Sequence, residues 1–184
     1  MNTSRQRFDD VALHGEGFVL RPWRRDDLDA LVAHANDAEV AHGLADRFPH
    51  PYTRDDGEVF LAGEVVDFSD PVFAVVVDGR ACGAINAHPG SAERAHSAEL
   101  GYWLGRAAWG RGLMTRAVGV FAPWAMRELR LHRLYAGVYD FNRASMRVLE
   151  KNGFADEGVQ RCAIVKRGQL HDLRMYAKVR ETLD

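Results

Sequence analysis

Apolar residues along the chain follow two patterns: short β-rich runs, and longer stretches with apolar positions three and four apart. The β-rich runs predict strands over 17–23, 72–77, 81–88, 97–104, 132–138, 154–161 and 170–179. The helical spacing predicts helices beginning at Asp26, over 39–44, from a Thr53 cap to about Val66, from about Leu113, and over 142–152. Asp78-Gly79 indicates a tight hairpin between the second and third β-rich runs.

The order of these elements predicts an α+β fold with a central, mostly antiparallel mixed sheet of about seven strands. Three antiparallel-type strands follow one another over 72–104, and the helix after Leu113 is the clear crossover between two strands. We therefore expect helices on both faces of the sheet. A length of 184 residues suits one domain, so we expect a partly disordered N-terminal segment over 1–16 and a single domain over 17–180.

The composition narrows the class of protein without identifying a function. It is 47% hydrophobic and 27% charged with a formal net charge of −2, which argues against a dominant nucleic-acid-binding surface. Cys82 and Cys162 lie in no paired motif and the histidines lack ligand spacing, so we expect two buried free thiols and no metal site. The polar start of the chain and the lack of a long apolar run predict a cytoplasmic protein without a membrane segment.

The segment from Leu104 to Thr115 carries the most informative local pattern. It predicts a strand end, a short loop, and a helix that begins at two glycines, Gly110 and Gly112. The free N–H groups of a first helical turn, together with the helix dipole, can bind a phosphate or pyrophosphate, and Arg111 adds a cation there. The glycines can equally serve only to turn a strand into a helix, and their spacing matches neither a P-loop nor a dinucleotide-binding fingerprint.

Two blocks of sequence resemble one family. Residues 98–104 (Ala-Glu-Leu-Gly-Tyr-Trp-Leu) and 109–115 (Trp-Gly-Arg-Gly-Leu-Met-Thr) resemble the acyl-CoA motif of Gcn5-related N-acetyltransferases (GNAT), particularly their ribosomal-protein N-terminal acetyltransferase (RimJ/RimL-type) branch. Residues 142–154 are similar to the family's Asn-x-x-Ser helix ending in Gly-Phe. The superfamily pattern Gln/Arg-x-x-Gly-x-Gly/Ala reads Trp109-x-x-Gly112-x-Met114 here, so two of its three defined positions depart. The resemblance covers about 17–178.

The resemblance implies a GNAT fold in which the strand 97–104 splays from the strand 132–138 and acyl-CoA lies in the opening. The pantetheine arm would pair with the backbone of Trp103, Leu104 and Gly105, and Asn142 would hold it from the other side. The pyrophosphate would sit on the glycine turn, formed by Trp109, Gly110, Arg111, Gly112, Leu113, Met114 and Thr115. Acetyl-CoA, or CoA as its product, is therefore the expected donor substrate.

Amide formation from a thioester needs a neutral amine and a stabilised leaving thiolate. Glu99 is the candidate base, since it matches the glutamate base of histone-type members; a charged residue on a solvent-facing strand is the alternative. Ser145 is the candidate acid of this branch, because Leu149 stands where many members carry a tyrosine; the alternative is a serine that only satisfies its own helix. Some members of the branch have a base in the final hairpin, near Ile164 here, and its absence shifts the role to Glu99.

The acceptor is less determined. Asn86 can face the acceptor or bridge neighbouring strands, Arg21 can bind an acidic group or pair with Asp26, and Trp103 and Trp109 are expected to line the acceptor pocket. The resemblance favours a protein N-terminal α-amine, no nucleic-acid or membrane partner, and a homodimer. A small-molecule amine acetyltransferase and a non-catalytic acyl-CoA-binding module remain as alternatives.

Overall fold

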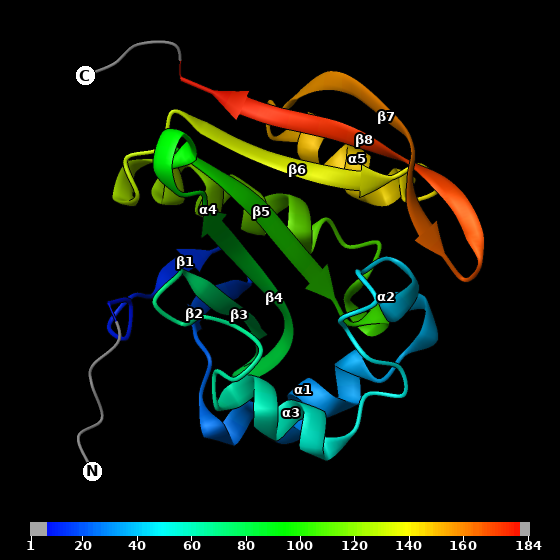
Figure 1. Ribbon diagram of the computed structural model, residues 1–184. Coiled ribbons are helices and arrows are strands. Elements are labelled where there is room, and N and C mark those ends of the chain that lie inside the picture. Colours follow the sequence, from blue (N-terminus) through cyan, green and yellow to red (C-terminus); the bar gives the residue numbers. More distant parts are fainter. Residues whose placement is uncertain (1–6, 181–184) are drawn as a thin grey trace.

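The computed structural model describes residues 7–180, which build one eight-stranded sheet with helices on both of its faces (Figure 1). The strand order is β1-β2-β3-β4-β5-β6-β8-β7, and every neighbouring pair is antiparallel except β5 and β6. The strands are β1 (Leu13–Gly15), β2 (Phe18–Pro22), β3 (Val72–Val77), β4 (Arg80–Pro89), β5 (Ser97–Leu104), β6 (Arg133–Tyr139), β7 (Ala155–Lys166) and β8 (Gln169–Val179). The expected mixed, mostly antiparallel sheet is confirmed.

The helices divide between the two faces of this sheet. They are α1 (Leu28–Ala35), α2 (Ala38–His42), α3 (Arg54–Leu61), α4 (Leu113–Glu128) and α5 (Arg143–Lys151). α4 and α5 bury their apolar side chains in the main core with Leu100 and Leu134, whereas α1 packs with Tyr52 and Trp103 on the opposite face. No helix within residues 7–180 is long and apolar enough to cross a membrane.

Local sequence signals explain several element ends. Thr53 begins α3 by accepting the Asp56 N–H at 3.2 Å, and the Asp56 carboxylate accepts the Thr53 N–H at 2.7 Å in return. Asp78 and Gly79 adopt φ angles of 48° and 78°, the left-handed pair that the two-residue β3–β4 hairpin requires. Pro123 lies inside α4, which continues beyond it to Glu128.

The parallel pair of β5 and β6 separates soon after it forms. Residues 97–99 pair with residues 133–135, and the pairing stops there. β5 continues to Leu104 beside β4 alone, and β6 continues to Tyr139 beside β8 alone (Figure 1). The sheet is therefore open along the carboxyl-terminal halves of both strands, as the expected splay requires.

The first edge of the sheet contains a strand that the sequence pattern does not predict. β1 is an eighth strand, and Phe8 is only 4% exposed in the core, so the fold begins before the expected boundary at residue 17. A strand of three residues is too short to show alternation, which is why the pattern does not reveal it. Residues 1–6, part of the segment for which partial disorder is expected, and 181–184 lie outside the described residues. α3 also ends at Leu61, not near Val66.

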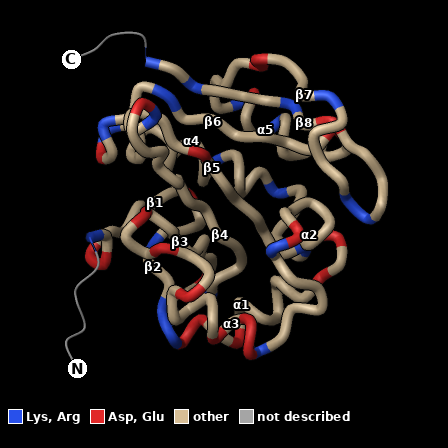
Figure 2. The backbone as a smooth tube through the Cα atoms, in the orientation of Figure 1, with Lys and Arg blue, Asp and Glu red and all other residues tan. Residues whose placement is uncertain are grey.

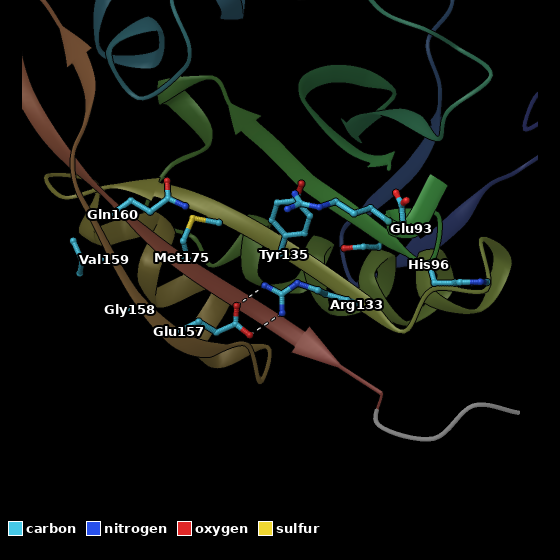
Figure 3. A pocket seen from close by; sticks show the side chains of 11 residues that line it. Glu93, His96, Arg133, Tyr135, Glu157, Gly158, Val159, Gln160 and Met175 are labelled. Atoms are coloured by element: carbon cyan, nitrogen blue, oxygen red, sulfur yellow. Dashed lines mark hydrogen bonds and ion pairs between the residues drawn. The ribbon is translucent and has the colours of Figure 1, made fainter. Parts of the chain in front are cut away.

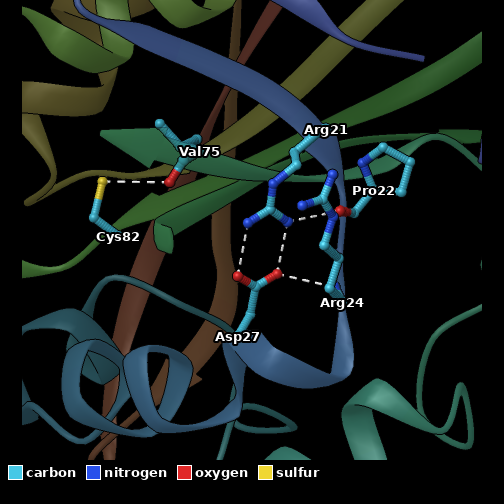
Figure 4. Close-up of polar contacts among 6 residues, drawn as sticks. All are labelled: Arg21, Pro22, Arg24, Asp27, Val75 and Cys82. Atoms are coloured by element: carbon cyan, nitrogen blue, oxygen red, sulfur yellow. Dashed lines mark hydrogen bonds and ion pairs between the residues drawn. The ribbon is translucent and has the colours of Figure 1, made fainter. Parts of the chain in front are cut away.

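Two expectations about single residues are corrected. Arg21 pairs with Asp27, not with Asp26: its two terminal nitrogens lie 2.7 and 2.8 Å from the Asp27 carboxylate (Figure 4). This bidentate geometry satisfies a carboxylate that is only 5% exposed. Cys82 is buried, as expected, but Cys162 is exposed, because β7 is an edge strand open to solvent along most of its length.

Candidate active site

Backbone groups of β5 face the opening between β5 and β6. Gly105 donates its N–H to the Cys82 carbonyl of β4 at 2.8 Å. Because backbone groups alternate in direction along an antiparallel strand, those of Leu104 and Tyr102 point the other way, into the opening. The Trp109 indole N–H bonds the Leu104 carbonyl at 2.8 Å and so holds the following loop against the strand end. An extended ligand with amide groups can pair with the rest of this edge.

The amino-terminal end of α4 has free amides at the edge of the opening. Gly110 and Gly112 adopt φ angles of 74° and 65°, a left-handed conformation that glycine enters without strain. Gly112 is the N-cap of α4 and its end has no side-chain cap among the described residues. The Arg116 N–H bonds back to the Gly112 carbonyl at 3.1 Å, so the three preceding N–H groups have no intrahelical partner. They lie at the positive end of a 16-residue helix, where a pyrophosphate fits.

The amino-terminal end of α5 borders the other side of the opening. Asn142 caps this helix by accepting the Ser145 N–H at 3.1 Å. The Ser145 Oγ lies 2.8 Å from the hydroxyl of Tyr102 on β5, and that hydroxyl is also 3.2 Å from the Ser145 carbonyl oxygen. Burial raises the pKa of the Tyr102 phenol, and the hydrogen bond with Ser145 only partly offsets this. Two neutral hydroxyl groups therefore meet between β5 and α5.

Glu99 lies on the opposite face of β5 from Tyr102. It is exposed and shares its face with Gly101 and Trp103. The Asn86 amide covers Gly101 so closely that a Cβ at the glycine would come 2.7 Å from its Oδ1. Trp103 packs against Phe48, with 5.6 Å between the ring centroids. Glu99 thus stands where β5 and β6 separate, on the face that α1 and α3 cover farther along.

An open hollow of about 670 Å³ lies on this same face (Figure 3). Tyr135, which pairs with Glu99 across β5 and β6, lines the hollow together with Met175 of β8. Arg133 and Glu157 form an ion pair across β6, β8 and β7 at its edge (Figure 3). Glu99 itself does not line the hollow, but its pairing partner Tyr135 does.

The structure brings the predicted cofactor residues together around one opening. They run from the end of β5 into the first turn of α4, with Asn142 opposite: Trp103, Leu104, Gly105, Trp109, Gly110, Arg111, Gly112, Leu113, Met114 and Thr115. Trp103 and Trp109, both expected to line the acceptor pocket, differ in setting: Trp103 packs toward α1 and Trp109 is 46% exposed at the glycine turn.

Two weaker acceptor candidates lie elsewhere or have another partner. Arg21 lies on β2, which β3 and β4 separate from β5, and its guanidinium binds Asp27, which favours the structural alternative for it. Asn86 reaches across to β5, as a residue that bridges strands does.

Sequence reasoning missed Tyr102. Its position between Leu100 and Leu104 on the buried side of β5 is typical of a core residue. The available signal was a hydroxyl on an otherwise apolar strand face. Such a hydroxyl needs a partner when it is buried, and the partner is Ser145.

The family model and the curated relatives that match this chain all describe acetyltransferases. Residues 18–155 match the family model described as "Acetyltransferase (GNAT) domain". The Bacillus subtilis (strain 168) "Probable N-acetyltransferase YjcK" is 44% identical over 81 residues, 44% of this chain and 45% of that protein. The "Putative ribosomal N-acetyltransferase YdaF" of the same organism is 33% identical over 103 residues, 56% of each. The chain thus spans about half the length of the curated relatives it matches.

Solved structures share the fold over nearly the whole chain. A GNAT-family acetyltransferase from Bacillus anthracis superposes with a TM-score of 0.80 at 22% identity, covering 92% of this chain and 98% of that one. RimL, described as a ribosomal L7/L12 alpha-N-protein acetyltransferase in complex with coenzyme A, superposes with a TM-score of 0.81 at 18% identity, with the same coverage. These likenesses confirm the α+β fold, with eight strands where about seven are expected.

Proposed function

Because the chain belongs to the GNAT acetyltransferase family, we propose that it transfers an acetyl group from acetyl-CoA to a primary amine. The observation that carries this proposal is the opening between β5 and β6, with free amides of α4 at its edge and the Ser145 hydroxyl on its other side. A thioester arm in the opening would have its reacting carbonyl accessible from both faces of the sheet. Acetyl transfer needs such access, because the amine must reach one face of the carbonyl carbon and add to it before the thiol leaves.

The residues around the opening suit the parts of CoA. Amides at the positive end of α4 suit the pyrophosphate, and the free edge of β5 suits the amides of the pantetheine arm. Asn142 and Ser145, at the start of α5, stand on the far side of that arm. CoA, when bound, supplies the activated acyl group and the leaving thiol.

In this proposal the reaction proceeds by direct attack, without a covalent acyl-enzyme. Glu99 accepts a proton from the amine, directly or through water, and the nitrogen lone pair forms the C–N bond. The C–S bond breaks, its electron pair passes to sulfur, and the Ser145 hydroxyl hydrogen-bonds to the thiolate. Glu99 and Ser145 lie on opposite sides of β5, so Glu99 would contact the amine and Ser145 would contact the leaving sulfur.

A protein N-terminal α-amine is the acceptor that we propose. YdaF is named as a ribosomal N-acetyltransferase and RimL as an alpha-N-protein acetyltransferase. An α-amino group, with an ordinary pKa of about 7.7–8.0, loses its proton more readily than a lysine does. Acidic side chains gather around α1 and α3 (Figure 2), and two of them, Asp29 and Glu58, pair with Arg54: Asp26, Asp29, Asp55, Asp56 and Glu58.

The test is CoA release from acetyl-CoA measured against a panel of amines. The panel contains peptides with a free N-terminus, the same peptides with a blocked N-terminus and a free lysine, and small amines such as a polyamine and an amino acid. We expect the free N-termini to react and the blocked peptides to remain unchanged. Turnover of small amines alone would replace the protein acceptor by a small molecule. Acetyl-CoA binding without any turnover would indicate a non-catalytic acyl-CoA-binding module.

A further inference from the structure

Trp109 holds its indole ring at the carboxyl-terminal end of β5, on the side of the opening. The indole N–H donates to the Leu104 carbonyl at 2.8 Å. This carbonyl and the Gly105 N–H belong to one trans peptide unit and point in opposite directions. Because the Gly105 N–H bonds to Cys82 of β4, the Leu104 carbonyl points into the opening. The ring therefore approaches the strand end from the opening, and its hydrogen bond fixes its orientation.

Much of this ring is uncovered. Trp109 is 46% exposed and is the only aromatic residue among the exposed large apolar side chains of residues 7–180. Single exposed apolar residues are common on protein surfaces, so exposure alone indicates no ligand. Here the ring is also held in place and lies beside the proposed acyl-CoA site. A ligand that covers it therefore orders little that is not already ordered.

The indole also limits the hydrogen bonds that β5 offers to a ligand. The backbone groups of Tyr102 and the N–H of Leu104 face the opening, but the Leu104 carbonyl already accepts from Trp109. Amides of a ligand can therefore pair with β5 only up to Leu104. Beyond that point the ligand meets the ring and then the free amides at the start of α4. The protein thus presents a hydrogen-bonding edge, an aromatic ring and an anion site, in that order.

CoA carries groups that match these three features in the same order. From the sulfur outward, its arm has two amides, then a carbon that bears two methyl groups, and then the pyrophosphate. With the amides on β5 and the pyrophosphate at the start of α4, the dimethyl carbon falls beside the Trp109 ring. Methyl groups and an aromatic face are both apolar, so their contact removes apolar surface from water.

We propose that the Trp109 ring binds the dimethyl carbon of the pantetheine arm and so selects a branched arm over an unbranched one. This inference rests on the proposed function, because it takes acetyl-CoA as the donor. The contact lies away from the thioester and is the same before and after acetyl transfer. It therefore contributes to the binding of acetyl-CoA and CoA alike, and not to the chemical step.

Two other roles for Trp109 are separable by matched variants. The ring can stack on the adenine of CoA, or the indole N–H can serve only to hold the loop against β5. Trp109→Gln keeps a side-chain N–H and removes the ring, whereas Trp109→Phe keeps a ring and removes the N–H. Leu170→Gln, at a leucine of β8 that is also exposed, is the control for loss of an apolar surface residue.

The experiment is calorimetry with CoA and with an analogue of CoA that has CH₂ in place of the dimethyl carbon. Wild type should bind the unbranched analogue about tenfold more weakly than CoA, the usual effect of losing two buried methyl groups. Trp109→Gln should bind both about equally, with CoA about tenfold weaker than in wild type. Trp109→Phe and Leu170→Gln should keep the preference for CoA.

A third probe, adenosine 3′,5′-bisphosphate, carries the adenine without the arm. Wild type and Trp109→Gln should bind it within about twofold of each other. A loss of this binding in Trp109→Gln, with the preference for CoA unchanged, would overturn the inference in favour of stacking on adenine. An equal loss of affinity for CoA and its analogue in both Trp109→Gln and Trp109→Phe would overturn it in favour of the loop contact.

The wild-type protein alone also tests the inference. Equal affinities of wild type for CoA and the unbranched analogue would overturn it, whatever the variants do. Acetylation of the amine panel by that same protein would then leave the proposed function intact. A wild-type protein that binds neither acetyl-CoA nor CoA would refute the proposed function and the inference together.

Discussion

At the scale of single residues, Gly112 shows what the glycine turn requires. Its φ of 65° is left-handed, and a Cβ built on it would meet only the Arg116 Nη1, at 3.4 Å. The position therefore requires a left-handed backbone conformation, while the space around a Cβ at this position is open. A side chain placed there would project into the region where the pyrophosphate is proposed to bind.

We predict that Gly112→Asp and Gly112→Asn differ strongly in acetyl-CoA affinity. Both residues tolerate the left-handed conformation and have nearly the same size, so they differ by one charge. Repulsion between a carboxylate and the pyrophosphate should weaken binding of the Asp variant by about tenfold or more relative to the Asn variant. Calorimetry at two salt concentrations measures this difference, which should shrink at high salt. Equal affinities would move the pyrophosphate away from this turn.

Glu99→Gln tests the proposed base. The substitution keeps the size of the side chain and removes its ability to accept a proton, so kcat/KM should fall by about 10²–10⁴ with little change in acetyl-CoA affinity. Raising the pH should restore part of the rate, because more of the amine is already neutral. Glu58→Gln, at an exposed glutamate on α3, is the matched control. A Glu99→Gln enzyme with the wild-type rate would leave Glu99 as a solvent-facing residue of β5.

At the scale of elements, the features that the sequence predicts correctly are those set by residues close together in the chain. The Thr53 cap, the Asp78-Gly79 hairpin and the glycine turn each depend on residues close in the chain, and all three appear as expected. The pairing of Arg21 with Asp27 depends on how β2 meets the turn before α1, so its exact partner is not encoded in spacing. The contact between Tyr102 and Ser145 depends on the docking of α5, and alternation along β5 alone hides it.

The packing of α1 on the end of β5 predicts a loss of stability in acid. His34 of α1 covers Gly105 so closely that a Cβ there would lie 2.3 Å from its Nδ1. Burial lowers the pKa of His34, and the nearby Arg80 lowers it further. The unfolded chain therefore takes up a proton first as the pH falls through about 6.5, the ordinary histidine pKa, and folding stability decreases below that pH.

We expect the decrease in Tm between pH 7.5 and pH 5.5 to be smaller in His34→Gln than in wild type. Burial also lowers the pKa of His42, so part of the decrease should persist. His14→Gln, at an exposed histidine of β1, should leave the pH dependence unchanged. Identical Tm profiles of His34→Gln and wild type would show that His34 does not contribute.

At the scale of the whole molecule, the segment before β1 belongs to the folded core. Phe8 meets Trp124 of α4 at 5.7 Å and Phe73 of β3 at 6.3 Å between ring centroids, both edge to face. It thereby joins the first edge of the sheet to the helix that presents the glycine turn. An N-terminal truncation placed at residue 17 would remove this contact together with β1.

Phe8→Ala should therefore lower the free energy of unfolding by about 3–5 kcal/mol, the usual cost of truncating a buried phenylalanine. Urea denaturation followed by fluorescence measures the change. Val65→Ala, at a valine that is 68% exposed, is the control and should change stability by less than about 0.5 kcal/mol. A similarly small effect of Phe8→Ala would mean that the segment adds little to the fold.

The gap between β5 and β6 has a consequence for amide exchange. In the free protein, the N–H groups of Tyr102 and Leu104 face the gap, whereas the Gly105 N–H is held by β4. The first two should exchange with deuterated solvent faster than the third. Pantetheine in the gap would act as a substitute strand, so acetyl-CoA should slow Tyr102 and Leu104 selectively and bring them toward the rate of Gly105. Binding of acetyl-CoA would then fill the gap between β5 and β6 and place the thioester for reaction.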